Sequence, residues 1–100
     1  MASVTWTDPA LDDLRETCEF IGRDSPRVAE IFASRAFIVT DRLGMFPSSG
    51  RAVPEHGRED IREIIFGNYR IIYHVLPDEV EVIAFVHGAR DIGREILERQ

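Results

Sequence analysis

The sequence predicts an α+β domain in which an antiparallel helical hairpin packs on one face of a twisted, mainly antiparallel sheet. Three observations support this prediction. Apolar residues recur at helical spacing in the first half of the chain, and alternating runs of β-branched and aromatic residues fill the second half. A length of 100 residues suits one hydrophobic core, so residues 1–100 are expected to form a single domain.

The first half predicts an edge strand followed by two helices. Residues 2–6 alternate small polar residues with β-branched and aromatic ones, which is typical of a short strand. Pro9 suits the first turn of a helix, and apolar residues then follow at intervals of three and four to residue 22. The dipeptide Ser25-Pro26 begins a second helical pattern that runs to about residue 43. The short turn between the two patterns predicts the hairpin.

The second half predicts three antiparallel strands and a short terminal helix. Residues 46–58 hold two prolines, two glycines and two serines, which indicates a long surface loop of the kind that often has a function. Turn-forming dipeptides, Gly67-Asn68 and Pro77-Asp78, separate the predicted strands over residues 61–66, 69–76 and 80–87. A helix over residues 91–99 ends the chain. This order of elements predicts the layered fold.

Alternation along these strands predicts a cationic cluster on the sheet. Because side chains of a strand alternate between faces, Arg70 and His74 share one face of their strand. We expect the helices to bury the aliphatic side of the last strand, which consists of Val80, Val82, Ala84 and Val86. His87 would then join Arg70 and His74 on the opposite side, over Ile72, Ile83 and Phe85. Histidine transfers protons and arginine stabilises phosphate charge, so this cluster suits RNA cleavage without a metal.

The same residues also have a purely structural interpretation. In it the two histidines are half-buried sheet residues and Arg70 forms an ion pair with Glu63 or Glu81. The other arginines would pair with neighbouring carboxylates in solvent, where each pair contributes only about 0 to 1 kcal/mol. Both interpretations remain open at the level of sequence.

Composition excludes several classes of protein. The chain carries 18 acidic and 12 basic residues for a net charge of −6, which disfavours a general polyanion binder. One cysteine, Cys18, and three dispersed histidines offer no metal-ligand spacing, and no glycine-rich loop could hold a nucleotide, so we expect neither a metal nor a cofactor. Without a disulfide framework, signal peptide or apolar membrane segment, the chain is expected in the cytoplasm and not in a membrane.

A set of short motifs in a fixed order carries a family resemblance. In the first half these are Trp6-Thr7, Ala10, Asp13-Leu14, Ser25-Pro26, Pro47, Gly50-Arg51 and Val53-Pro54-Glu55. In the second half they are Arg62-Glu63-Ile64, the run from Gly67 to Tyr73, and His87-Gly88-Ala89-Arg90-Asp91. Together they resemble the ParE/RelE superfamily of bacterial toxins from type II toxin–antitoxin modules, also called plasmid stabilisation proteins. The resemblance implies a helical hairpin on a sheet.

The resemblance implies one of two targets. RelE-like members are ribosome-dependent endonucleases that cleave mRNA, and for that activity the candidate catalytic residues here are Arg70, Arg90, Glu63 and His87. The chain departs from that pattern, because it has no lysine and has Ile96 where a terminal tyrosine is expected. ParE-like members poison DNA gyrase, and the Gly-Arg-x-Val-Pro-Glu and His-Gly-Ala-Arg-Asp segments look more like this branch. Growth arrest through gyrase is therefore the favoured expectation, with target contacts from Arg51, Arg58, Arg62, Arg90 and Arg94.

The resemblance also implies a cognate antitoxin, either ParD-like or RelB-like, in a hetero-oligomer with this chain. Such antitoxins bring a disordered segment that folds on the toxin as an amphipathic helix across the hairpin. The candidate contacts for it are Phe37, Ile38 and Phe46. A third interpretation is an inactive toxin-like binding module that retains only antitoxin binding.

Overall fold

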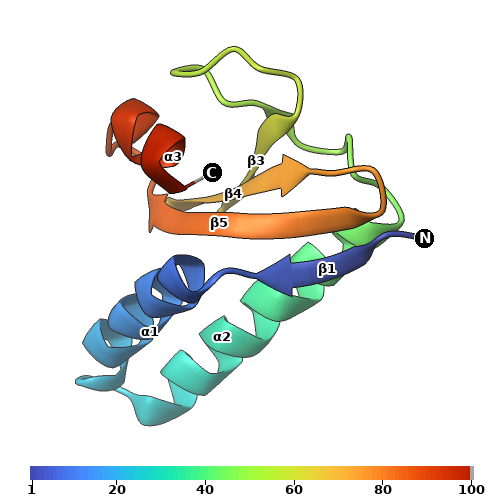
Figure 1. Ribbon diagram of the computed structural model, residues 1–100. Coiled ribbons are helices and arrows are strands. Elements are labelled where there is room, and N and C mark those ends of the chain that lie inside the picture. Colours follow the sequence, from blue (N-terminus) through green and yellow to red (C-terminus); the bar gives the residue numbers. More distant parts are fainter. Residues whose placement is uncertain (100) are drawn as a thin grey trace.

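The computed structural model describes residues 1–99 and contains one mixed sheet between two helical layers (Figure 1). In chain order the elements are β1 (Ser3–Trp6), α1 (Asp8–Gly22), α2 (Pro26–Asp41), the 3₁₀ turn η1 (Arg42–Gly44), β2 (Arg51–Ala52), β3 (Ile61–Phe66), β4 (Tyr69–Val75), β5 (Glu79–His87) and α3 (Gly93–Arg99). The predicted α+β class and the order of the long elements are confirmed. The two-residue strand β2, inside the predicted loop, was not expected.

Local capping explains where the helices of the hairpin begin. The Thr7 hydroxyl accepts a hydrogen bond from the Ala10 amide at 3.3 Å, and Pro9 occupies the first turn, where no amide donor is needed. The Ser25 hydroxyl accepts one from the Val28 amide at 3.2 Å in the same way. Two helices with well-defined starts and a short connection therefore lie side by side below the sheet (Figure 1).

The sheet has the order β1-β5-β4-β3-β2. The pairs β5–β4, β4–β3 and β3–β2 are antiparallel, whereas β1 lies parallel to β5 at one edge. The predicted edge position of the first strand and the mainly antiparallel sheet are confirmed. Strands β1 and β5 are neighbours in the sheet, although the whole hairpin and strands β2, β3 and β4 lie between them in the chain.

Each face of the sheet has its own apolar core. The hairpin covers one face, where the buried residues are Ala10, Leu14, Ala36, Leu43, Ile71, Tyr73, Val80, Val82 and Phe85. The loop before β3 and helix α3 cover the other face, where they are Val53, Ile61, Ile72, Ile83, Ala84, Val86, Ile92 and Ile96. The sequence predicted only the first layer, because the second is built from short segments with no long helical pattern.

A β-bulge corrects the predicted faces of β5. The register pairs Ile72 with Ala84 but Tyr73 with Val82, so Ile83 is an extra residue in β5. Beyond it the alternation is inverted, and Ala84 and Val86 lie on the α3 side while Phe85 packs under the hairpin. The expected single aliphatic face of this strand is therefore wrong, since strict alternation cannot anticipate an inserted residue.

An ion pair between Arg99 and Asp13 connects helix α3 to the hairpin. The Arg99 guanidinium donates to Asp13 Oδ2 of α1 at 2.7 Å and to the Ile83 carbonyl at 2.8 Å. Asp13 Oδ2 also accepts a hydrogen bond from the Phe85 amide at 3.0 Å. These contacts join α1, β5 and α3 next to the bulge. Within residues 1–99, none of the helices is both long and apolar enough to cross a membrane.

Gly50 provides a stability test of the junction between the long loop and the sheet. A Cβ at this position would lie 2.4 Å from the Glu63 carbonyl oxygen and 2.6 Å from the Tyr73 hydroxyl, so the backbone must shift. We expect Gly50→Ala to lower the unfolding free energy by about 1 to 3 kcal/mol in urea denaturation. Gly22→Ala is the matched control, because its Cβ would meet only Ala29 Cβ at 3.7 Å. Equal stability of the two variants would contradict the close packing at Gly50.

Candidate functional site

The most unusual polar feature of the molecule is a buried arginine in the middle of the sheet. Arg70 lies on β4, on the face covered by the loop and α3, and is only 5% exposed. Its guanidinium contacts two carboxylates at once, since Nη1 lies 2.9 Å from Glu55 Oε1 and also 2.9 Å from Glu63 Oε1. Nη2 donates to Glu55 Oε2 at 2.7 Å. The pair with Glu55 is therefore bidentate, which is the strongest geometry for this type of contact.

A second arginine completes the site. Glu63 on β3 is fully enclosed by its neighbours, and its other carboxylate oxygen accepts hydrogen bonds from Arg51 of β2, with Nε at 2.8 Å and Nη2 at 2.7 Å. Two cations and two anions thus alternate in one cluster, here called the Arg70 cluster, which consists of Arg51, Glu63, Arg70 and Glu55. Its formal charge is zero, which is what allows it to be buried.

The Arg70 cluster also orders the chain after β5. Arg70 Nη2 donates to the Arg90 carbonyl oxygen at 2.6 Å, so this guanidinium on β4 contacts the loop, strand β3 and the segment that leads into α3. The hydrogen bond from Arg70 holds the pKa of the Glu55 carboxyl well below its usual range, at about 2. The two carboxylates raise the pKa of Arg70 further. Glu55 and Arg70 are therefore both ionised at neutral pH.

The predicted cluster of Arg70, His74 and His87 does not exist in the structure. His87 pairs with Tyr69 across the strands, and their rings meet edge to face at 5.8 Å on the hairpin side. His74 does share a face with Arg70, but its Nε2 lies 3.0 Å from Asp60. The bulge at Ile83 causes this error, because it reverses the alternation of β5 before His87 is reached. The structural interpretation is confirmed for the ion pair of Arg70 with Glu63.

The other candidate arginines differ in how freely they face solvent. Arg58 holds Asp60 in a bidentate pair, with Nη2 at 2.6 Å, and Arg62 donates to the Gly50 carbonyl at 2.8 Å. Arg90 pairs with Glu95 of α3. Two side chains keep more than half of their surface in solvent despite an ion pair, namely Arg51 at 62% and Arg90 at 52%. Arg94 is exposed on α3.

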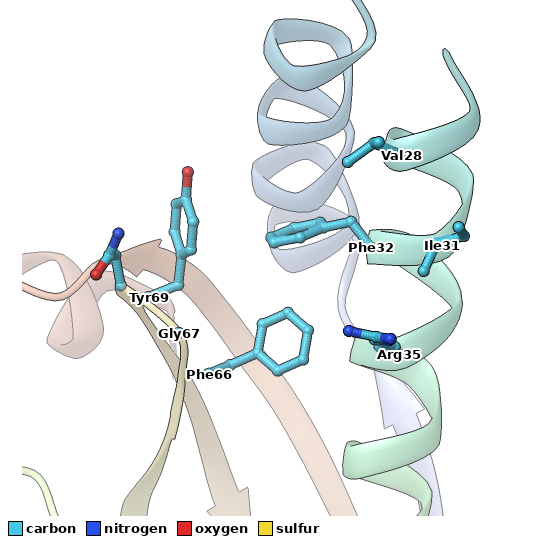
Figure 2. Close-up of a pocket in the computed structure, with 8 residues that line it drawn as sticks. Val28, Ile31, Phe32, Arg35, Phe66, Gly67 and Tyr69 are labelled. Carbon is cyan, nitrogen blue, oxygen red and sulfur yellow. The ribbon is translucent and has the colours of Figure 1, made fainter. Parts of the chain in front are cut away.

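A separate apolar groove lies on the hairpin side of the molecule, between α2 and the β3–β4 turn. Figure 2 shows Phe32 of α2 pointing across it toward Phe66 and Tyr69, with Val28 and Ile31 along its helical wall and Arg35 at one end. Its volume is about 400 Å³. Val28 and Ile31 are 52% and 43% exposed, so α2 has apolar side chains with no partner in the described chain. The sequence did not predict this groove, because helical spacing does not distinguish a core face from a docking face.

The exposed apolar residues predicted from sequence extend this surface along α2. Ile38 is 54% exposed and lies seven residues, or two turns, beyond Ile31. Phe37 is 38% exposed and packs partly against Trp6, with ring centroids 5.0 Å apart. Phe46, 61% exposed, follows the 3₁₀ turn. An apolar strip therefore runs along α2 from the groove toward η1.

Comparisons with known proteins agree with this fold. The model of a family described as the ParE toxin of the type II toxin–antitoxin system, parDE, matches residues 4–92. A curated relative, Toxin RelE2 of Caulobacter vibrioides, is 34% identical over 90 residues, which cover 90% of this chain and 99% of the relative. A solved structure described as a chromosomal ParDE system from P. aeruginosa shares the fold with a TM-score of 0.72 at 17% identity, over 87% of this chain and 96% of that one.

These matches confirm the resemblance to toxins of the ParE/RelE superfamily. The chain belongs to the ParE toxin family of type II toxin–antitoxin systems.

Removal of the central guanidinium tests the energetic role of the Arg70 cluster. Arg70→Met keeps most of the side-chain length but leaves Glu63 buried beside Arg51 alone and Glu55 without its main partner. We expect the unfolding free energy to fall by about 3 to 5 kcal/mol, as for other buried pairs that lose one member. Arg15→Met is the control, with an expected loss of at most about 1 kcal/mol because both members of its ion pair with Asp12 are largely exposed. Equal losses in urea denaturation would contradict a central position for Arg70.

The lowered pKa of Glu55 predicts a pH dependence of stability. Its carboxyl titrates near 4.5 when unfolded and at about 2 when folded, so its stabilising effect is complete above the first value and is lost as the pH falls toward the second. The pKa of the Asp60 carboxyl is also lowered, to about 2, so its contribution to stability has the same pH dependence. We expect Glu55→Gln to be less stable than the wild type at neutral pH, and the difference to shrink on acidification. A difference in unfolding free energy between the two proteins that stays constant across this pH range would contradict the lowered pKa of Glu55.

Proposed function

We propose that this chain is the toxin of a type II toxin–antitoxin module and that it arrests growth by poisoning DNA gyrase rather than by cleaving RNA. The observation that supports this choice is the state of Arg70. The guanidinium that would stabilise a scissile phosphate in a RelE-like nuclease is 5% exposed and already holds two carboxylates. It is not free to bind a phosphate in this conformation.

Proton transfer at Arg70 also lacks suitable partners. RNA cleavage without a metal needs a general acid and a general base close to the phosphate-binding group. The sequence offered Glu63 and His87 as candidates for proton transfer. Glu63 is fully buried between two arginines, and His87 lies on the opposite face of the sheet. A gyrase poison requires no such chemistry, because it acts by binding.

The exposure of the arginines supports a choice among the candidate target contacts. Arg51, Arg90 and Arg94 present exposed side chains around the α3 side of the molecule. Arg58 forms an ion pair with Asp60, and Arg62 donates a hydrogen bond to the Gly50 carbonyl of the loop. We therefore propose the first three as the principal contacts with the gyrase–DNA complex, together with weaker contributions from the other two.

The antitoxin is proposed to bind the hairpin side. An amphipathic helix of a ParD-like or RelB-like partner would place apolar side chains into the groove of Val28, Ile31 and Phe32 and continue along α2 to Ile38. Phe37 and Phe46 would flank this helix. An acidic residue of the partner would meet Arg35 at the end of the groove.

Induced expression in cells distinguishes the two targets. With the chain under a tightly repressed promoter, we expect growth arrest with induction of the DNA damage response while messages remain intact. With purified components, the chain should increase the amount of DNA held in the gyrase cleavage complex. A combined Arg90→Ala and Arg94→Ala variant should retain its fold, because both side chains are exposed, and lose most of this effect.

The opposite result would support mRNA cleavage, the alternative that is in keeping with the name of the RelE2 relative. Codon-positioned cleavage of messages without a DNA damage response would contradict the proposal. Absence of both responses, from a chain shown to be folded, would indicate an inactive binding module.

The antitoxin surface is tested by adding charge to the groove wall. We expect Ile31→Asp to weaken binding of the cognate antitoxin at least tenfold in calorimetry, since it places a carboxylate among apolar side chains. Arg15→Ala on α1 changes the net charge by the same amount and lies outside the groove, so it is the control. Unchanged affinity of Ile31→Asp, with the fold intact, would place the antitoxin elsewhere.

A further inference from the structure

The Glu55 carboxylate occupies a well-formed binding edge of Arg70. Two parallel contacts, at 2.9 Å from Nη1 to Oε1 and 2.7 Å from Nη2 to Oε2, have the geometry with which arginine recognises carboxylates in other molecules. Glu55 belongs to the loop between β2 and β3, not to the sheet. A loop residue therefore fills a site whose other half, Arg70, is fixed in the centre of β4.

Glu55 is one of two carboxylate partners of Arg70. Glu63, held rigidly on β3, contacts the same guanidinium at 2.9 Å and is fully buried. When Glu55 leaves, Arg70 therefore keeps a carboxylate partner, and the remaining Arg51, Glu63 and Arg70 have a net charge of +1. That charge favours the entry of one replacement anion.

The loop position that places Glu55 on Arg70 leaves a polar atom unsatisfied. His56, the next residue, has its Nε2 buried without a hydrogen-bond partner among the described residues. The loop itself turns tightly, because the His56 and Gly57 amides both donate to the Val53 carbonyl, at 3.0 and 2.9 Å, and Gly57 has a φ of 71°. A tight turn with an unsatisfied side chain opens more readily than the strands around it.

An open hollow gives access to this position. Its volume is about 620 Å³ and its lining consists of Glu55, His56, Asp91, Gly93, Arg94 and Leu97. Asp91 and Arg94 also line an adjoining hollow with Glu95 and Glu98. Acidic residues thus outnumber basic ones around the entrance. They disfavour a ligand with several negative charges inside the hollow, but they tolerate a single carboxylate whose neighbours are neutral or basic.

We propose that Arg70 is a masked carboxylate-binding site, in which an acidic side chain of a partner peptide with neutral or basic flanking residues displaces Glu55 from the guanidinium. This site lies on the α3 side of the sheet and is separate from the groove of α2. It goes beyond the proposed function, since it requires neither gyrase nor RNA as the target. Displacement would release the loop at residues 55–57, while the buried Val53 and the sheet stay in place.

Acetate serves as the probe for the vacated position. Thermal unfolding of Glu55→Ala should shift upward with sodium acetate in a saturable way, and sodium chloride at equal ionic strength should give no such shift. The wild type should need at least tenfold more acetate for the same shift, because its tethered Glu55 competes at a high effective concentration. Glu95→Ala, which removes a carboxylate from the nearby pairs with Arg90 and Arg99, should not respond.

Two results in this experiment would overturn the proposal. One is an equal acetate response of Glu95→Ala, which would indicate a general effect of charge. The other is no response from any variant that remains folded. A stronger response to inorganic phosphate than to acetate would show that the carboxylate assignment is wrong.

Opening of the loop in the wild-type protein is tested separately by amide hydrogen exchange. The His56 and Gly57 amides should exchange at least tenfold faster than amides in the middle of β4, through a local opening that leaves the sheet folded. Exchange of all these amides at one common rate would mean that Glu55 leaves Arg70 only on global unfolding, and the proposal would fail. Neither experiment depends on gyrase, so the result is independent of the target assignment.

Discussion

The buried charge of Arg70 is the constraint on which the second layer of this protein depends. A guanidinium in the centre of a sheet must be compensated where it lies, because an unpaired charge at this depth is costly. Glu63 provides one partner from the neighbouring strand, and the loop must bend over the sheet to provide Glu55. The Arg90 carbonyl is held by the same group, which sets the direction of the chain into α3. The apolar core of Ile72, Ile83 and Ile96 then forms around these polar contacts.

The two faces of the sheet consequently have different characters. The hairpin side is apolar and aromatic, with unpartnered side chains on α2 that suit a helical partner (Figure 2). The α3 side carries the Arg70 cluster, the exposed side chains of Arg51, Arg90 and Arg94, and an acidic rim around the hollow next to Glu55. This division allows the proposed antitoxin and target contacts to reside on opposite layers of a domain of 100 residues, above and below the sheet in Figure 1.

Much of this architecture follows from the sequence alone, because its elements are local. Proline and hydroxyl caps at residues 7–9 and 25–26, glycine and proline turns, and alternating β-prone runs define the hairpin and the meander without long-range information. The bulge at Ile83 was not predictable in this way, since its only signal is one extra residue in an otherwise regular strand. Because of this bulge, His87 lies on the hairpin side and not on the face predicted for it. The contact of Glu55 with Arg70 was missed because it depends on how an irregular loop folds back over the sheet, although Glu63 was correctly considered as a partner.

Direct observation of the Arg70 side chain tests the central claim of this account. In nitrogen–proton NMR spectra at neutral pH, a guanidinium held by Glu55 and Glu63 should show separate, slowly exchanging Nη protons, because rotation about its terminal bonds requires several hydrogen bonds to break. Arg94, exposed on α3, provides the internal comparison and should give a single averaged signal. Separate Nη signals for Arg70 that collapse in Glu63→Gln would support a buried, structural arginine. Averaged, rapidly exchanging signals like those of Arg94 would contradict it and would make Arg70 available for chemistry at the surface.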